Sequence, residues 1–523
     1  MPSQVTGSTG NERPRQRRNE MDPRLGRLAA LLASAVLIAV ACSNPTTSAS
    51  PVAPSASAAA ASESAATSEA PATSGEPSAT PVPTPLPAND SQSKPGDVLI
   101  RWFCCLGTGD QPEQVEVERR IADEFNASHP GIHLRFEGYV YSAARDGLSV
   151  QLASGNGPDI VGPVGIGGAN AFHGQWLDLQ PLIDKNKFDM SVYPKSTVNL
   201  YNVGGEGQVG IPYAVYPSVL FYKAGLFKEA GLNEPPHEWG ATYKMPDGSV
   251  VPWDWDTVTK IAKTLTVDKN GADATEAGFD PQNVVQWGLE PQRDDIRQTG
   301  AYWKAGSFVA ADGKTVQIPD AWVAAWKSFY SQIWTDHTAV DYAKFNNTDF
   351  NPNGYPFFTG KVAMSPNYLW SMYGVKDAGD DWNMAATPSY QGQTTAAFNA
   401  DTFRILKSTK NQDAAFTVLQ YLLGNQELLK LYGGMPAVES KQDAFLQSLQ
   451  ADYTQPIDWK VAKEGVNHAD VPNFESYTPA YNETLDLITK FGTKWQSTPG
   501  LNLDSEIADL KSQMQAIWDK GGS

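Results

Sequence analysis

Cysteine and histidine are scarce in this chain, with three and six residues among 523. Apart from Cys42, only the adjacent pair Cys104 and Cys105 is left, and two cysteines cannot form a disulfide framework. The histidines show no grouping with cysteine, so we expect no metal and no other cofactor. A Gly-x-Ser-x-Gly elbow and a phosphate-binding loop are also missing, which argues against two common classes of enzyme.

Positive charge is in short supply as well. The 40 Lys and Arg residues face 58 Asp and Glu residues, which gives a net charge of −18. Such an acidic surface disfavours nucleic acid and anionic lipid as partners. Tryptophan and tyrosine, in contrast, are abundant, with 15 and 20 residues. Their rings suit sugar ligands, although they more often fill protein cores.

The first 41 residues carry six arginines and then an apolar run at 28–40 that is too short to span a bilayer. Small residues lead into Cys42, and this junction resembles the processing box of bacterial lipoproteins, in which the cysteine takes a diacylglyceryl group. An ordinary cleavage site is the alternative, and Met21 is an alternative start. We predict that 1–41 is a signal peptide, and that Cys42 anchors the chain by its lipid to the outer face of the cell membrane.

The stretch after Cys42 is almost all Ser, Ala, Pro, Thr and Glu. It has too little apolar surface to offset the entropy lost on ordering. We therefore predict that 42–95 is the lipidated cysteine followed by a disordered spacer. The rest of the chain, 96–523, is too large for one ordinary core, and two lobes are expected.

Strand and helix patterns alternate at the start of this folded region. Short apolar runs predict strands at 98–103, 132–136 and 158–161, and helical spacing predicts helices at 111–126 and 143–153. The β-α-β-α-β order predicts a doubly wound α/β lobe, in which the loops beginning at Cys104, Glu137 and Gly162 face a ligand cleft. Later segments predict helices at 255–265, 322–334, 413–423 and 503–518. A loop is predicted at 231–253.

Several short motifs recur in a fixed order along the folded region. They lie at 155–161 (GNGPDIV), 210–216 (GIPYAVY), 220–232, 358–364 (FTGKVAM), 408–415 and 433–440. In this order they resemble the extracellular solute-binding proteins of ABC importers, in particular the sugar-binding group that includes maltose-binding protein. Each motif alone is weak, whereas the set spans residues 98–518.

The resemblance implies two doubly wound α/β lobes joined by a hinge with several crossovers. On this basis we expect lobe 1 at 96–215 and 399–440, and lobe 2 at 216–398. The segment 441–523 would belong to lobe 2 or pack on the hinge. It also implies a monomer that is not an enzyme, which captures a carbohydrate by hinge closure and delivers it to a membrane permease.

Ligand-binding candidates follow from the chemistry of sugars, which present an apolar C–H face and a rim of hydroxyls. By resemblance, Asn367 and Trp370 occupy positions where maltose-binding protein has an asparagine and a stacking tryptophan, and Tyr368 lies between them. Tyr216 stands at a crossing where that protein has a glutamate, a departure that puts a maltodextrin ligand in doubt. Asp401, at the second crossing, suits a hydroxyl acceptor.

Further candidates come from loops and from the late part of the chain. Asp110 follows the first predicted strand, and Tyr139 and Tyr141 follow the second; solvated surface is the alternative for all three. Trp303 is a possible second platform with core packing as the stronger alternative. Gly434 and Met435 would bring backbone amides near the ligand. Tyr477 lies where the family often supplies a late aromatic side chain.

The adjacent pair Cys104 and Cys105 is open to two interpretations. Adjacent cysteines close only a strained ring, and strained disulfides have functional or redox character. In oxidised form the flat ring would offer a sugar platform at the end of the first strand. Two reduced, partly buried thiols are the alternative.

Two other functions remain open. A cationic solute such as a polyamine would suit an acidic, aromatic-rich chain. A secreted glycan-active enzyme would need an acid and a nucleophile or base across the scissile bond. The carboxylate pairs 294–295 and 380–381 are adjacent in sequence, which is typical of solvated surface and not of such a site.

Overall fold

The computed structural model describes residues 83–290, 299–352, 354–372, 379, 381–470, 475 and 477–521. The predicted signal peptide, the lipid site Cys42 and the spacer up to residue 82 lie outside this range, as do 294–295 and 380. In the part of the chain that is described, no helix has both the length and the apolar character needed to cross a membrane.

The first lobe is built on three parallel strands, β1 (Val98–Cys104), β2 (Ile132–Gly138) and β3 (Ile160–Val164). Helices α2 (Pro112–Ser128) and α3 (Tyr141–Ala153) connect them. Strand β1 lies in the centre and pairs in parallel with both neighbours. The predicted β-α-β-α-β alternation is confirmed, and each loop after a strand emerges at the same edge of the sheet.

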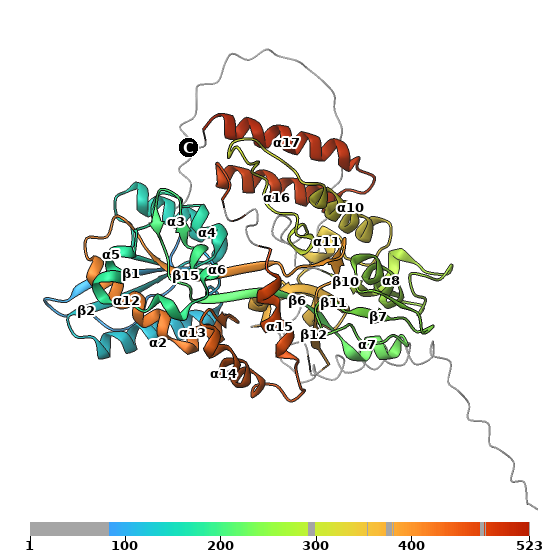
Figure 1. Cartoon of the computed structure of the whole chain (residues 1–523), viewed down its shortest axis with the longest axis horizontal. Helices are drawn as coiled ribbons and strands as arrows, with labels where there is room; N and C mark the ends of the chain where they lie inside the picture. The colour runs from blue at the N-terminus through green and yellow to red at the C-terminus, as the bar shows by residue number, and fades with distance from the viewer. Residues whose placement is uncertain are drawn as a thin grey trace, which may run out of the picture.

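Two long strands link the lobes, β6 (Ala214–Tyr222) and β15 (Phe398–Ile405). The strand order is β2-β1-β3-β15-β6-β11-β10-β9, so one mixed sheet runs through both lobes (Figure 1). Strand β15 pairs with β3 at its carboxyl end and with β6 at its amino end, antiparallel in both cases. The boundaries predicted at 215/216 and 398/399 fall within these two strands. The fold is thus two α/β lobes joined by crossing strands.

The second lobe contains the rest of this sheet. Its strands are β9 (Val267–Asp268), β10 (Val284–Leu289), β11 (Val362–Tyr368) and β12 (Asn383–Ala385). Its helices include α7 (Ala224–Glu229), α8 (Trp255–Leu265), α10 (Asp320–Trp334) and α11 (Tyr342–Phe345). The loop predicted at 231–253 is wrong in part, because it contains a hairpin, β7 (Thr242–Lys244) with β8 (Val250–Pro252).

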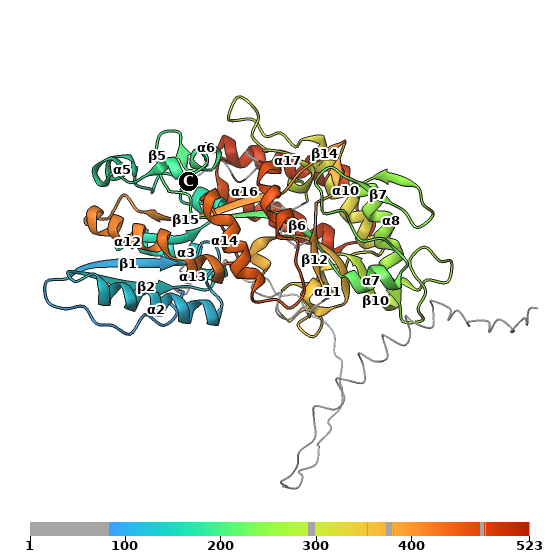
Figure 2. The ribbon, with the colours of Figure 1, turned by 60° about the horizontal axis from the view of Figure 1, so that its bottom comes forward.

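The chain after β15 returns to the first lobe and then crosses again. This part consists of α12 (Gln412–Gly424), α13 (Gln426–Leu431), β16 (Met435–Pro436), α14 (Glu439–Gln450), α15 (Trp459–Gly465), α16 (Tyr481–Ser497) and α17 (Leu503–Asp519). Helix α15 packs on β6 at the crossing, while α16 packs against α10, α11 and α17 (Figure 1). Figure 2 shows α16 and α17 next to each other from a second direction. The predicted helices at 413–423 and 503–518 are confirmed, and α16 was not anticipated.

Short elements complete the two lobes. The helices are α4 (Ile166–Asn170), α5 (Gln180–Asn186) and α6 (Lys195–Asn199). The two-residue strands form the pairs β4 (Asn202–Val203) with β5 (Gly207–Gln208) and β13 (Ser389–Tyr390) with β14 (Gln393–Thr394).

The end of the predicted spacer is part of the fold. Leu86 donates its backbone N–H to the Gly138 carbonyl over 2.7 Å, beside the edge strand β2. The Asn89 amide donates to Asp123 over 2.8 Å and accepts from the Phe136 backbone over 2.9 Å. The predicted spacer boundary at 95 is therefore too late, because these hydrogen bonds hold the chain on lobe 1 despite its polar composition.

Candidate functional site

A cavity of about 560 Å³ lies between the lobes. From the first lobe it is lined by the segments that follow β1, β2 and β3, as the sequence predicts for their loops. From the other side it is lined by α11, the segment after β11 and the start of α16. The lining residues used below are Thr108, Asp110, Gln111, Gln114, Tyr141, Arg145, Gly167, Trp370, Asn399, Asp401, Glu475, Tyr481 and Asn482.

Trp370 supplies the aromatic wall, immediately after β11. Its ring stacks on Tyr368 at a centroid distance of 4.0 Å and a tilt of 15°. The ring of Tyr216 meets it at 5.5 Å and 59°. Two aromatic neighbours thus fix the plane of Trp370 and leave the indole as the member of this group that reaches the cavity.

Asp401 brings a carboxylate to the floor of the cavity from β15. The side chain is only 4% exposed, yet it lines the pocket. Two glycines allow its approach: an ideal Cβ on Gly107 would stand 2.8 Å from Oδ2, and one on Gly165 would stand 3.1 Å from Oδ1. Larger residues at either position would displace the carboxylate.

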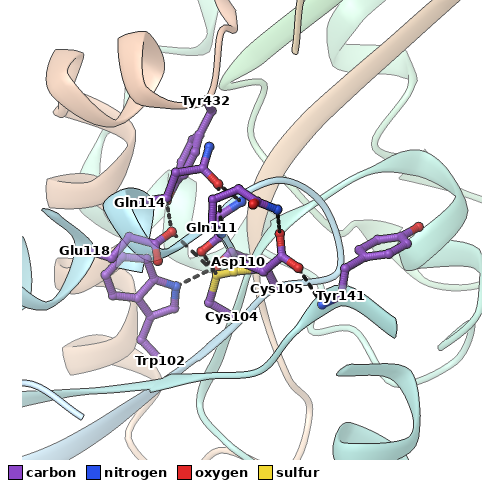
Figure 3. The surroundings of a disulfide bond; sticks show 11 residues. Trp102, Cys104, Cys105, Asp110, Gln111, Gln114, Glu118, Tyr141 and Tyr432 are labelled. Atoms are coloured by element: carbon purple, nitrogen blue, oxygen red, sulfur yellow. Dashed lines mark hydrogen bonds between the residues drawn. A yellow bond between two sulfur atoms is a disulfide. The ribbon is translucent and has the colours of Figure 1, made fainter. Parts of the chain in front are cut away.

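Asp110 supplies a second carboxylate from the loop after β1. Its Oδ1 accepts from the Gln111 side chain over 3.0 Å, and its Oδ2 accepts from the Tyr141 backbone N–H over 2.9 Å (Figure 3). The second bond lies at the first residue of α3, where the helix dipole also favours negative charge. The Tyr141 side chain, 48% exposed, lines the same cavity.

Tyr216 lies behind the wall and not in it. Its side chain is fully buried and outside the lining. Burial raises the pKa of this phenol well above its ordinary value, and the nearby charge of Asp401 adds to the rise. The phenol therefore stays neutral, and its ring supports Trp370 from behind.

Several other predicted residues are also placed away from the cavity. Asn367 is buried on β11, where its Oδ1 accepts from the Tyr368 backbone over 2.8 Å. Met435 is buried in β16 beside β6, and an ideal Cβ on Gly434 would meet the Tyr216 hydroxyl at 3.0 Å. Tyr477 is 47% exposed and turns its ring edge to His173 instead.

Two aromatic candidates pack in cores, which corrects the role predicted for Tyr139 and agrees with the stronger alternative given for Trp303. Tyr139 stacks on Phe103 at 4.9 Å, a contact that holds its ring in the first lobe's core. Trp303 packs against Tyr390 at 4.2 Å and against Trp255 at 6.0 Å. Neither lines the cavity. Hydrophobic burial holds both rings in the cores of their lobes, away from the cavity.

Cys104 and Cys105 form a disulfide across a cis peptide bond. Both residues are fully buried and neither lines the cavity, which corrects the prediction of a sugar platform. Their sulfurs and a Glu118 oxygen lie within 4.8 Å of one another, a spacing that would suit a metal ion. The disulfide uses both sulfurs, so in this state they do not provide thiolate ligands.

Other lining residues were missed by the sequence analysis. Asn399 lies two residues before Asp401 on one face of β15, and Arg145 lies one helical turn after Tyr141, so both had a periodic signal. Glu475, Tyr481 and Asn482 had none, because only tertiary packing brings them to the cavity. The Asn399 amide donates to the Glu475 carboxylate over 2.9 Å.

Two lobes that share strands and enclose a polar, aromatic-walled cavity define a binding protein of the periplasmic type. A family model described as "Bacterial extracellular solute-binding protein" matches residues 120–455. The chain belongs to this family of extracellular solute-binding proteins of ABC transporters.

Individual relatives are distant. A lipoprotein of Streptomyces antibioticus, uncharacterized and encoded in the oleD 5′ region, is 22% identical over 61% of this chain and 66% of its own length. The chain thus spans just under two thirds of this curated relative.

Solved structures share the fold. An ABC substrate-binding protein of Listeria monocytogenes in complex with cycloalternan aligns with TM-score 0.63 and 20% identity over 82% of this chain and all of that one. The sugar-binding protein MalE of Xanthomonas citri aligns with TM-score 0.60 and 16% identity over 81% of this chain and 98% of that one. The GacH receptor of Streptomyces glaucescens, described in complex with acarbose, aligns with TM-score 0.59 and 16% identity over 80% of this chain and 98% of that one.

Proposed function

We propose that this chain captures a carbohydrate in the interlobe cavity, closes its lobes around it and delivers it to a membrane permease. Cys42 would hold the protein at the outer face of the membrane by its lipid. One observation carries the proposal: a stacking tryptophan, two carboxylates and several amides converge on one cavity lined from both lobes. Trp370 suits the apolar face of a sugar ring, and Asp110 and Asp401 suit its hydroxyls.

The bound solute would drive closure because it touches both lobes only in the closed form. A ligand shifts such an equilibrium by its difference in affinity for the two states. The solved relatives described with cycloalternan and acarbose favour an oligosaccharide as the solute. Asp110, Asp401 and Glu475 would also suit a cationic solute, so a polyamine is included in the test below.

The test is a thermal-shift screen of the full chain against mono- and oligosaccharides, spermidine and glycerol phosphate. A ligand present at 100 times its Kd adds about 2.7 kcal/mol to the free energy of unfolding. We expect a sugar to raise the melting temperature. Small-angle scattering with that sugar should show a more compact particle, and an unchanged profile would contradict closure.

Matched variants distinguish the effect of a cavity-lining side chain from that of an exposed side chain outside the cavity. Tyr141→Ala and Tyr477→Ala remove two similarly exposed tyrosines, of which only the first lines the cavity. Trp370→Ala should weaken sugar binding at least tenfold and Tyr141→Ala severalfold, with Tyr477→Ala as the unaffected control. A response to spermidine alone would overturn the carbohydrate proposal, and so would full sugar affinity in Trp370→Ala.

A further inference from the structure

A buried cluster lies directly beneath the loop that carries Asp110. It consists of the Cys104–Cys105 disulfide, Glu118 and Tyr432, all fully buried. The Tyr432 hydroxyl donates to Glu118 Oε1 over 2.5 Å, and the same oxygen lies 3.5 Å from Cys104 Sγ (Figure 3). Glu118 Oε2 has no hydrogen-bond partner among the described residues. A carboxyl group is thus held against a disulfide, away from solvent.

Gly109 covers this cluster. Its φ of +120° is reserved for glycine, and an ideal Cβ there would stand 2.7 Å from Cys105 Sγ and 2.5 Å from Glu118 Oε1. The loop backbone therefore rests on the sulfurs with no space between. Any movement of the sulfurs would be passed to the loop.

Gln114 ties the same loop from the other side. Its Oε1 accepts from the backbone N–H groups of Gly109 over 3.1 Å and Gln111 over 3.2 Å. Its Nε2 donates to the Leu431 carbonyl over 3.1 Å, at the end of α13. Asp110, between these two amides, is the residue that this arrangement presents to the cavity.

We propose that the Cys104–Cys105 disulfide, together with Gln114, positions Asp110 and Gln111 in the binding site, and that reducing the disulfide loosens this loop and weakens solute binding. The effect on the solute rests on the proposed function. The effect on the loop does not, and the two are tested separately.

The chemical step is a two-electron reduction by a dithiol. One thiolate of the reductant attacks one cysteine sulfur, the S–S bond breaks, and its electron pair goes to the other sulfur, which takes a proton. The second thiolate of the reductant then attacks the mixed disulfide and releases the first cysteine, which is protonated in turn. The chain gains two hydrogens and the reductant leaves as a disulfide.

Reduction changes the space beneath the loop. Sulfurs that are no longer bonded must separate to van der Waals contact, and Gly109 occupies the space above them. Glu118 Oε1, at 3.5 Å from Cys104 Sγ, is within reach of the new thiol hydrogen. The cluster therefore offers a hydrogen-bond acceptor for a thiol but no space for two separated sulfurs, and the loop at Gly109 must move.

Hydrogen exchange of the full chain tests the loop. After treatment with dithiothreitol and a mass increase of two hydrogens, the Gly109 and Gln111 amides should exchange at least tenfold faster. The Leu134 amide, which donates to Asn126 over 2.6 Å in the same lobe, is the internal control. Reoxidation should restore slow exchange. Full reduction with unchanged exchange at Gly109 and Gln111 would overturn the proposal.

Three variants keep the test decisive. The double variant Cys104→Ser, Cys105→Ser should exchange fast with or without dithiothreitol, and it replaces native reduction if the buried disulfide resists the reagent. In Gly109→Ala, with the disulfide intact, the loop amides should also exchange fast. This variant provides the test if the serine variant does not fold. Glu118→Gln keeps the shape and the disulfide and should stay slow until reduced. Slow exchange in the folded serine variant would overturn the proposal.

Titration with a sugar from the thermal-shift screen completes the test. Reduction should weaken its binding at least threefold in the wild-type chain and leave the serine variant unchanged. Equal affinity before and after reduction, with faster exchange at Gln111, would overturn the link to binding. If no sugar binds in either state, the proposed function fails while the exchange result still decides the loop.

Discussion

The Arg145 guanidinium donates to the Asp486 carboxylate over 3.3 Å and so joins helix α3 of the first lobe to helix α16 beside the second. Arg145 also lines the cavity. Next to this pair, the Asn482 amide donates to the Ala171 carbonyl over 3.2 Å. The mouth of the cavity is thus bridged in this structure by contacts between the two sides.

The first prediction concerns this ion pair. Asp486→Asn should weaken solute binding by up to about fivefold, because exposed ion pairs contribute at most about 1 kcal/mol. The loss should shrink at high salt, where the pair is already screened. Titration at two salt concentrations measures both effects.

The control for this prediction is Asp413→Asn. Asp413 pairs with Lys185 at 2.6 Å, also exposed, but within the first lobe. Its removal should leave the affinity and its salt dependence unchanged. If both variants behave alike, the Arg145–Asp486 pair has no special role in closure.

The second prediction concerns Gly167, on the short helix after β3. An ideal Cβ at this position would collide with the Tyr481 hydroxyl and stand 2.8 Å from Glu475 Oε1. Gly167→Ala should therefore push the start of α16 away from the first lobe and lower affinity severalfold. Gly204→Ala adds the same methyl group where nothing lies within 4 Å and serves as the control. Wild-type affinity in Gly167→Ala would show that this contact does not close the site.

The third prediction concerns the segment that docks on β2. Asn89→Ala should lower the free energy of unfolding by about 1–3 kcal/mol, because the buried Phe136 N–H loses its acceptor and the Leu134 carbonyl loses one of its donors. Urea denaturation measures the loss. Gln92→Ala, which removes an exposed bond to the Asp90 carbonyl, should change little. Equal stability of the two variants would contradict a stabilising contact between the Asn89 segment and strand β2.

The fourth prediction concerns pH. Burial raises the pKa of the Glu118 carboxyl well above its usual value, although the Tyr432 hydrogen bond opposes the rise. The folded state therefore holds this proton more tightly than the unfolded state. Its contribution to stability is fully present below the unfolded pKa of about 4.5 and is lost as pH rises toward the folded pKa.

The glutamine side chain in Glu118→Gln cannot ionise, so this variant should not lose stability in this way as the pH rises. The stability of the wild-type chain relative to the variant should fall as the pH rises above about 4.5, with a slope of at most about 1.4 kcal/mol per pH unit. Urea denaturation across this range measures the difference. Parallel pH profiles would show that the carboxyl group does not stay protonated in the fold.

The elements that sequence predicts best are those with local signals. Helix α8 has the ends predicted from sequence, 255–265. In the structure one face of it is buried, and the Asp254 side chain caps it by accepting from the Thr257 backbone over 2.8 Å. The hairpin β7–β8 was missed, because its strands have three residues each and lie among prolines and glycines.

The candidate site divides in the same way. Asp110, Tyr141, Trp370 and Asp401 all line the cavity. The first two follow strands that the sequence predicts, whereas Trp370 and Asp401 were proposed from the resemblance to solute-binding proteins. Tyr139, although it follows β2 by one residue, turns to stack on Phe103. The contribution of α16 depends on how the last helices pack, and no local pattern encodes that placement.

The docked segment at 86–91 also determines how the molecule bears load. With the lipid anchor at Cys42 that we propose, a pull on the N-terminal side would first meet the hydrogen bonds along β2, at the outer edge of the sheet. Strands β6 and β15 lie at the opposite side of the first lobe's sheet and would bear little of this force. In the proposed closure, the first lobe would then act as the fixed base, and the second lobe would move without force from the anchor.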